Sequence, residues 1–153
     1  MSILKKIAWN FNDTDYQTSD DFNKDISQYQ LDIMKERASW NPDEIVVNNP
    51  EVGIVYMYWV SEGDPVFDGE TKLGDEDEED DEEEEYDEDE QREVAAKFKA
   101  DNGKHFTALE LLHKLHQRLR HRNLGDHTFF EGLSFFNDSE KRNPPVYYLR
   151  CGS

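Results

Sequence analysis

Cysteine, long apolar runs and positive charge are all scarce in this sequence, and each scarcity argues against a class of protein. The single cysteine, Cys151, excludes an internal disulfide, which fits a reducing compartment. The longest apolar stretch, Gly53–Val60, is far shorter than the roughly 20 residues that a membrane-spanning helix needs. Lys5 and Lys6 are followed by no apolar run, so we expect no signal peptide and a cytoplasmic protein.

Acidic residues outnumber basic residues about two to one. Lysine and arginine total 17 against 36 aspartates and glutamates, a net charge of −19. The excess is local, because residues 75–90 contain 15 acidic side chains and one tyrosine, and the rest of the chain carries a net charge of only −4. A chain this acidic repels nucleic acid and anionic lipid, so we expect no direct binding to nucleic acid or to a membrane.

We call residues 75–90 the acidic block. One interpretation is a disordered, solvated loop, because like charges repel in any compact form. A second is a polyanionic arm that binds a basic partner, and a third is weak, diffuse cation binding without a defined cage. The candidate partner-binding residues are Asp75, Glu76, Asp77, Glu78, Glu79, Asp80, Asp81, Glu82, Glu83, Glu84, Glu85, Tyr86, Asp87, Glu88, Asp89 and Glu90.

Before the acidic block, alternating apolar residues at Ile7, Trp9 and Phe11 predict a short strand over 6–12. A helix capped by Ser19 is predicted to end near Ser39, since apolar residues follow at helical spacing. Its stripe consists of Phe22, Ile26, Tyr29 and Ile33.

Two strands are predicted next, over 44–47 and 52–60, with turn chemistry at 48–50 between them. The second is apolar on both faces, so we expect a central strand covered on both sides. The segment 63–74 reads as a loop leading into the acidic block.

After the acidic block, 91–101 is interpreted as a helix from the spacing of Val94, Ala95 and Phe98. Thr107 and Glu110 form a capping-box pattern that predicts a second helix, with Phe106 and Leu111 as its hydrophobic staple. A buried stripe is expected at Ala108, Leu111, Leu112, Leu115 and Leu119, and clustered positive charge at Arg118, Arg120, His121 and Arg122 suits the helix end.

Two closing strands are predicted over 129–136 and 146–151. Helices and strands are thus mixed without a strict alternation. The sequence predicts a single α+β domain over 1–153, with a mainly antiparallel sheet of about four to five strands, two or three helices, and the acidic block inserted between the halves.

The histidines offer a possible site for metal or catalysis. Glu110 and His113 have the Glu-x-x-His spacing of di-metal bundles, but such sites need two of these pairs and further carboxylates. We therefore expect no cofactor and no metal, with His113 and His116 on the polar side of the helix. Asp126 beside His127 is read as a polar turn, and Cys151 as a small strand residue.

Aromatic side chains are abundant and mostly expected in the core. Neighbours in a strand face opposite ways, so one member of each adjacent pair is a candidate interface anchor. The pairs are Phe129/Phe130, Phe135/Phe136 and Tyr147/Tyr148.

In size, acidity and single-domain character, the chain resembles bacterial immunity proteins, which are small cytosolic proteins that neutralise a cognate toxin by blocking it. The resemblance implies a non-enzymatic inhibitor of a basic toxin such as a nuclease. A nucleic-acid mimic or acidic chaperone for basic proteins is a second hypothesis. A metal-dependent enzyme is the third, using Glu110, His113, His116 and His127.

Overall fold

The fold was analysed in a computed structural model, which describes residues 2–4, 6–35, 40–59, 70–72, 91–120, 122, 124–125, 128–135 and 144–152. The helices in this part of the chain are α1 (Ser19–Met34) and α2 (Ala108–Leu119). The strands are β1 (Ser2–Ile3), β2 (Ile45–Val47), β3 (Glu51–Trp59), β4 (Glu70–Lys72), β5 (Gln91–Lys99), β6 (Phe106–Thr107), β7 (Phe129–Phe135) and β8 (Val146–Gly152). The α+β class predicted from sequence is confirmed.

The main sheet has six strands in the order β1-β7-β8-β3-β5-β4, and β2 and β6 form a separate two-stranded sheet. Neighbouring strands of the main sheet pair antiparallel, except for β3 and β8, which pair parallel. The sheet is therefore mainly antiparallel, as predicted, although it has more strands than expected.

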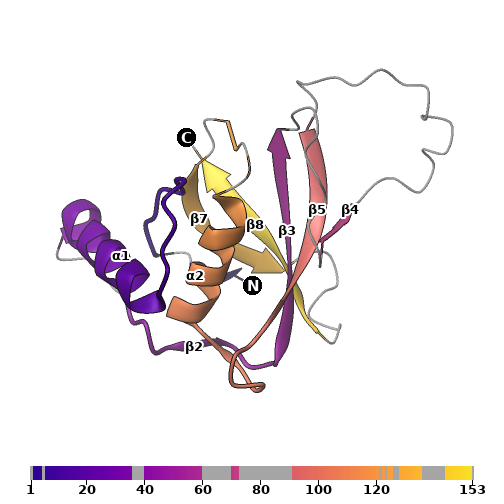
Figure 1. Ribbon diagram of the computed structural model, residues 1–153, viewed down its shortest axis with the longest axis horizontal. Helices are drawn as coiled ribbons and strands as arrows, with labels where there is room; N and C mark the ends of the chain where they lie inside the picture. The colour runs from indigo at the N-terminus through magenta and orange to yellow at the C-terminus, as the bar shows by residue number, and fades with distance from the viewer. Residues whose placement is uncertain are drawn as a thin grey trace, which may run out of the picture.

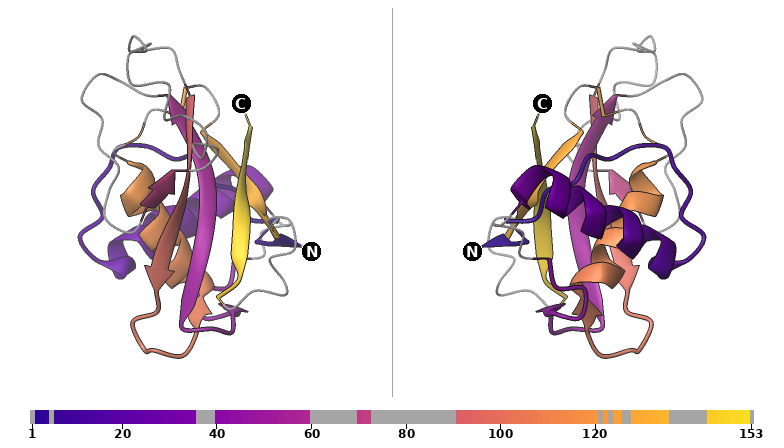
Figure 2. Two further views of the ribbon diagram at one scale, coloured as in Figure 1. Left: turned by 90° about the vertical axis from the view of Figure 1, so that its right-hand side faces the viewer. Right: turned by 90° about the vertical axis from the view of Figure 1, so that its left-hand side faces the viewer.

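Both helices lie on one side of the main sheet (Figures 1 and 2). The predicted central position of β3 is confirmed, because it lies between β8 and β5. The described helices lie on one face of β3, and the predicted cover of both faces is only partial. On the other face Val55 is buried, whereas Met57 is 41% exposed. Neither described helix is long and apolar enough to cross a lipid bilayer.

Helix α2 forms as its sequence predicts. The Thr107 hydroxyl accepts a hydrogen bond from the Glu110 amide at 3.2 Å and so caps the helix. The Glu110 carboxylate accepts from the Asp101 amide instead of completing the capping box, and it pairs with Lys114 at 3.2 Å. Every residue of the predicted apolar stripe is buried: Ala108, Leu111, Leu112, Leu115 and Leu119.

The predicted helix over 91–101 is wrong, because these residues form β5. Val94, Ala96, Phe98 and Ala100 are buried while Lys97 and Lys99 are exposed, which is the two-residue period of a strand. Pairing with β3 along the whole of β5 overrides the helical preference of its alanines and lysines.

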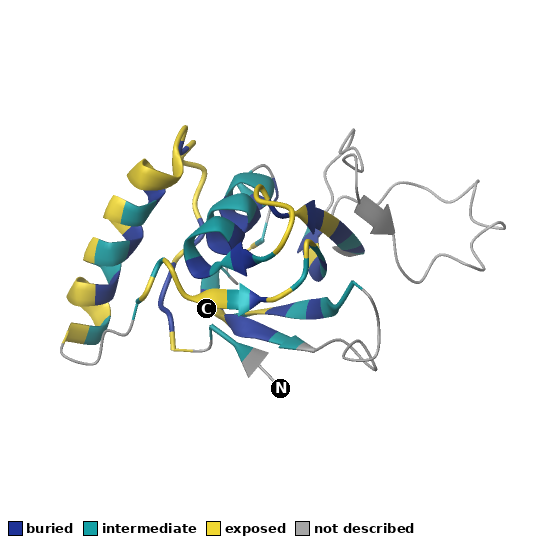
Figure 3. Cartoon of the chain, turned by 90° about the horizontal axis from the view of Figure 1, so that it is seen from below, coloured by how far each residue is buried: buried dark blue, intermediate teal, exposed yellow. Residues whose placement is uncertain are grey.

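Helix α1 is shorter than predicted, and the residue that caps it lies one position earlier than predicted. The Thr18 hydroxyl, rather than Ser19, accepts from the Asp21 amide. Phe22 and Ile26 are buried as predicted, but Ile33 is 47% exposed and Gln30 is buried in its place. The outer face of α1 is exposed along its length (Figure 3).

Gln30 is buried because it satisfies the backbone of the N-terminal segment. Its side chain accepts from the Ala8 amide at 2.8 Å and donates to the Ala8 and Ile26 carbonyls. An amide can satisfy both polar groups of an irregular buried segment, whereas an apolar side chain would leave them unpaired.

The predicted strand over 6–12 is reduced to a single bridge. Ile7, Trp9 and Phe11 are buried, as their alternation indicates, but only Asn10 bridges to Phe129. The strand at this end of the chain is β1, which pairs with β7.

The two strands predicted around the turn at 48–50 both form, but they do not pair with each other. Strand β2 pairs with β6, with Ile45 opposite Thr107, and β3 joins the main sheet. Strand β4 forms in the segment predicted as loop. The closing strands β7 and β8 are confirmed and pair antiparallel.

Candidate functional site: a pocket between β3 and β8

The acidic block lies outside the described residues, but the strands that flank it are described. Strands β4 and β5 pair antiparallel, with Lys72 opposite Val94. Gln91, which directly follows the block, is opposite Trp59 at the end of β3. The C-terminal end of the block is therefore joined to the sheet beside Trp59.

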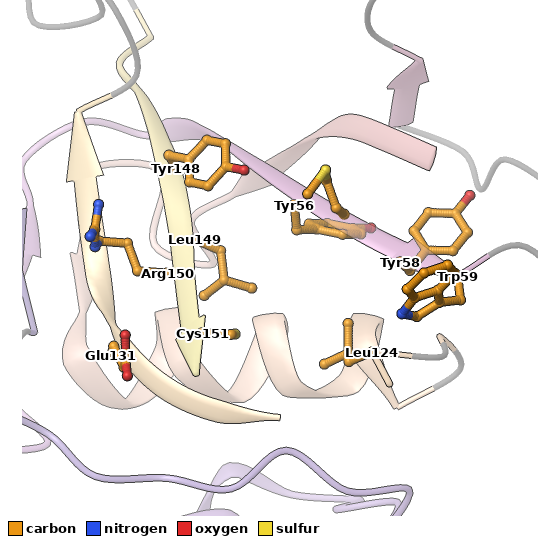
Figure 4. A pocket seen from close by; sticks show the side chains of 10 residues that line it. Tyr56, Tyr58, Trp59, Leu124, Glu131, Tyr148, Leu149, Arg150 and Cys151 are labelled. Atoms are coloured by element: carbon orange, nitrogen blue, oxygen red, sulfur yellow. The ribbon is translucent and has the colours of Figure 1, made fainter. Parts of the chain in front are cut away.

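The same end of β3 forms one wall of a pocket. The parallel pairing of β3 with β8 covers only Gly53–Val55 and Val146–Tyr148, although both strands continue beyond it. The two strands then diverge (Figures 1 and 4). Between their ends lies a pocket of about 470 Å³. We call it the β3–β8 pocket; it is lined by Tyr56, Met57, Tyr58, Trp59, Leu124, Glu131, Tyr148, Leu149, Arg150 and Cys151.

Aromatic and aliphatic side chains make up most of this lining. Tyr58, Trp59 and Leu124 lie together at one end, and Glu131 and Arg150 lie at the other (Figure 4). Both charged residues are exposed, so the charge belongs to the rim of the pocket. Such a site offers mainly apolar contact area, with the charged side chains only at its edge, which is typical of binding pockets.

Two polar groups of the pocket, the Cys151 thiol and the Tyr148 hydroxyl, stay protonated at neutral pH. Burial, with a smaller contribution from the Glu131 carboxylate, raises the pKa of the Cys151 thiol to about 12. Burial also raises the pKa of Tyr148, and the nearby Glu93 adds to the effect. A thiol in this state is a poor nucleophile, so the pocket suits binding better than covalent catalysis.

Gly125 packs closely on the pocket wall. Its φ is +66°, a conformation that favours glycine, and a Cβ added there would lie 2.7 Å from the Trp59 indole nitrogen. The absence of a side chain at Gly125 therefore helps to set the position of Trp59.

Two arginines, one in the last turn of α2 and one three residues beyond the helix, lie over aromatic rings of the sheet. The Arg122 guanidinium lies over the Tyr58 ring at 4.1 Å, and Arg118 lies over the Phe98 ring at 5.3 Å. Tyr58 and Phe98 belong to β3 and β5, so these cation–π contacts join the end of α2 to β5 and the segment after it to β3.

The histidines are placed differently from the prediction. His116 is fully buried among Trp9, Phe11, Tyr16 and Phe22, so its predicted position on the polar side of α2 is wrong. Its Nδ1 accepts from the Trp9 indole at 3.2 Å, and its Nε2 lies 2.9 Å from the Thr14 carbonyl, to which it donates in the matching tautomer. Both ring nitrogens are therefore occupied.

His113 Nε2 lies 2.9 Å from the Tyr16 carbonyl, and Glu110 is engaged with Lys114. Among the residues that the structure describes, no group of three His, Cys, Asp or Glu side chains is placed to hold a metal ion. Asp126 and His127, which were predicted to form a polar turn, lie outside those residues.

One residue of the pocket, Tyr148, belongs to a pair that the sequence offered as a candidate interface anchor. Of the pair Tyr147 and Tyr148, Tyr147 is buried and Tyr148 is half-buried in the pocket lining. In the pair Phe129 and Phe130, Phe130 is the buried member, and Phe136 lies outside the described residues. The pocket itself had no sequence signal, because it depends on where two distant strands stop pairing.

We found no protein-family model that matches this chain, and comparisons with curated proteins and with solved structures likewise gave no match.

Proposed function

We propose that this chain is an acidic binding protein that neutralises a basic protein partner in the cytoplasm, as an immunity-type inhibitor of a toxin such as a nuclease. The observation that carries the proposal is the acidic block, with 15 acidic residues in 16 positions. Its flanking strands β4 and β5 pair with each other, which supports an arm attached to the sheet at both ends.

The spacing of charge in the block suits a surface built for phosphate. An extended chain advances about 3.3 Å per residue, and phosphates along one DNA strand are about 3.4 Å apart. An extended acidic run thus has nearly the linear charge density of a nucleic-acid strand. It would occupy the substrate groove of a nuclease and raise the association rate by roughly ten- to a thousandfold.

The test uses a panel of purified basic nucleases, assayed for inhibition by the full chain. The matched control is a chain of the same length in which the 15 acidic residues of 75–90 are replaced by Asn and Gln. We expect one nuclease to be inhibited tightly, with affinity falling steeply between about 50 mM and 500 mM salt. The neutral variant should associate roughly ten- to a thousandfold more slowly.

If the neutral variant inhibits as strongly as the natural chain, the contact with the partner lies on the folded body. The acidic block would then have no role in binding. Binding that does not change with salt would have the same consequence.

The charge spacing also favours a second candidate, a nucleic-acid mimic or acidic chaperone for basic proteins. That function predicts comparable binding to many members of the same panel and to basic proteins that are not nucleases. One tight partner favours the inhibitor, and graded binding that follows partner charge favours the mimic.

A further inference from the structure

We infer that the split between β3 and β8 receives a short extended segment of a partner protein, which joins the main sheet as an additional strand. The inference goes beyond the proposed function, because it concerns only the described strands and needs no contact with the acidic block. The segment is recognised by its backbone amides and carbonyls, and its side chains are neutral and of moderate size.

Strand β3 directs the backbone of every second residue toward β8. The Gly53 amide donates to the Pro145 carbonyl at 2.9 Å. Because backbone direction alternates along a strand, Val55, Met57 and Trp59 direct their amide and carbonyl groups the same way. The residues between them direct theirs toward β5, with which β3 pairs along its whole length.

Strand β8 forms the other wall of the split and is arranged in the same way. Pro145, whose carbonyl accepts from the Gly53 amide, directly precedes β8. Leu149 and Cys151 lie an even number of residues farther along, so they also direct backbone groups toward β3. The split therefore has hydrogen-bonding groups on both of its walls.

These groups have no partner across the split. The pairing of β3 with β8 ends at Val55 and Tyr148. Among the residues that the structure describes, the backbone groups of Met57 and Trp59 therefore lack a partner on β8, and those of Cys151 lack one on β3. Donors and acceptors on an open strand edge are the groups that an added strand pairs with, and this pairing supplies the affinity in β-strand addition.

The size of the β3–β8 pocket agrees with a short strand. One residue of a strand occupies about 160 Å³, from a rise of about 3.3 Å, a strand spacing of about 4.8 Å and a sheet thickness of about 10 Å. The pocket of 470 Å³ therefore holds about three extended residues. The unpaired part of β3 runs from Tyr56 to Trp59, which is a matching length, and it diverges from β8 (Figure 4).

The side chains around the split indicate which segment fits. Met57 is 41% exposed, and Trp59 and Tyr148 are partly exposed, so they offer apolar contact to the side chains of the segment. Glu131 and Arg150 at the rim are exposed and opposite in charge, so together they favour a segment without net charge. We therefore expect a neutral segment of β-branched residues such as valine and threonine, which suit strands.

The experiment titrates the full chain with a capped neutral pentapeptide, Ser-Val-Thr-Val-Ser, and with its ester analogue. In the analogue, esters replace the amides of the two valines, which removes two N–H donors and leaves the side chains unchanged. We expect the peptide to bind at least about fivefold more tightly than the analogue, because two backbone hydrogen bonds are lost. Salt should change neither affinity, since both ligands are neutral.

Hydrogen exchange identifies where the peptide pairs. Bound peptide should slow the exchange of the backbone amides of Met57, Trp59 and Cys151, which face the split. The Val52 amide is the control, because Val52 is already paired with Phe98 of β5, and its exchange should stay unchanged.

Two variants at one position separate the backbone from the side chain. Met57→Ala keeps the amide and shortens only the side chain, whereas Met57→Pro removes the amide. We expect Met57→Pro to weaken binding of the peptide severalfold more than Met57→Ala does. If Met57→Pro does not fold, the comparison of the peptide with its ester analogue on the natural chain decides, because it needs no variant.

Slowed exchange at the three amides, together with tighter binding of the peptide than of the analogue, supports the inference. Equal affinity for the two ligands, binding without slowed exchange, or no binding of the peptide overturns it. A dimer that forms with rising concentration and protects the same amides also overturns it, because a second copy of the chain would then fill the split. The nuclease panel is a separate measurement, so the proposed function stands or fails independently.

Discussion

His116 is a polar residue that this fold uses as part of its core. It is fully buried, and both ring nitrogens have partners on the N-terminal segment, Trp9 and Thr14. Burial lowers its pKa, the Thr14 carbonyl opposes that effect, and His113 and Arg120 reinforce it. The neutral ring is therefore the form that the folded state selects.

This burial has a pH consequence. Below about pH 6.5 the unfolded chain binds a proton at His116 that the folded chain does not, so the free energy of unfolding falls with pH until the lowered pKa of the folded state is reached. His116→Gln replaces the ring with a side-chain amide, which forms hydrogen bonds but does not titrate. We expect its unfolding free energy, measured in urea between pH 7 and 5, to fall less than that of the natural chain. Parallel profiles would contradict the assignment.

Two glycines with positive φ allow the cost of backbone strain to be separated from the cost of a steric clash between an added Cβ and a neighbouring side chain. Gly103 has φ +71° and open space around its Cβ position, whereas Gly125 has φ +66° and faces the Trp59 indole at 2.7 Å. Gly103→Ala should cost about 1 kcal/mol from backbone strain alone. Gly125→Ala should cost more and should change the Trp59 fluorescence, both measured during urea unfolding. Equal costs with unchanged fluorescence would mean that Trp59 does not rest on Gly125.

At the scale of elements, α2 follows its sequence closely because its signals are local. Thr107 caps it, and the apolar stripe falls on one face. β5 does not follow its local signal, because its residues have weak strand preference and take their conformation from β3.

The caps of the two helices give a matched pair of substitutions. Thr107 caps α2, and Thr18 caps α1, each through one hydrogen bond from a backbone amide. Each change to alanine should reduce the free energy of unfolding by about 1 kcal/mol in a urea titration. A cost near zero for Thr107→Ala would show that packing, rather than the cap, determines where α2 begins.

At the scale of the whole molecule, we expect the concentrated negative charge to be separate from the fold. The net charge of −19 comes mostly from the acidic block, and the rest of the chain is close to neutral. The described core contains residues on both sides of the block, from Ile7 to Leu149.

Salt dependence of stability tests this separation. Concentrated negative charge opposes compactness at low ionic strength, and salt screens it. We expect the melting temperature of the intact chain to rise between about 20 mM and 500 mM NaCl. A chain with a short Gly-Ser turn in place of 75–90 should respond less and should still fold. Loss of the cooperative transition in the shortened chain would show that the core depends on the block.

Much of the fold could be predicted from sequence, but little of the site. The α+β class, α2 with its cap and stripe, the central strand and the closing strands all depend on short-range patterns. The interior position of His116 and the pairing of β2 with β6 involve partners far apart in the chain, so no local pattern indicates them.

The sequence by itself determined the concentration of acidity at 75–90, the single unpaired thiol and the apolar stripe of α2, because composition and periodicity are properties of the chain alone. Only the tertiary structure decided that β3 and β8 pair briefly and then diverge, and that Trp59 stands opposite the residue that follows the acidic block. The reason is physical: the pairing and twist of β3 and β8 are settled between segments nearly a hundred residues apart, so no local pattern in the chain specifies where they stop pairing.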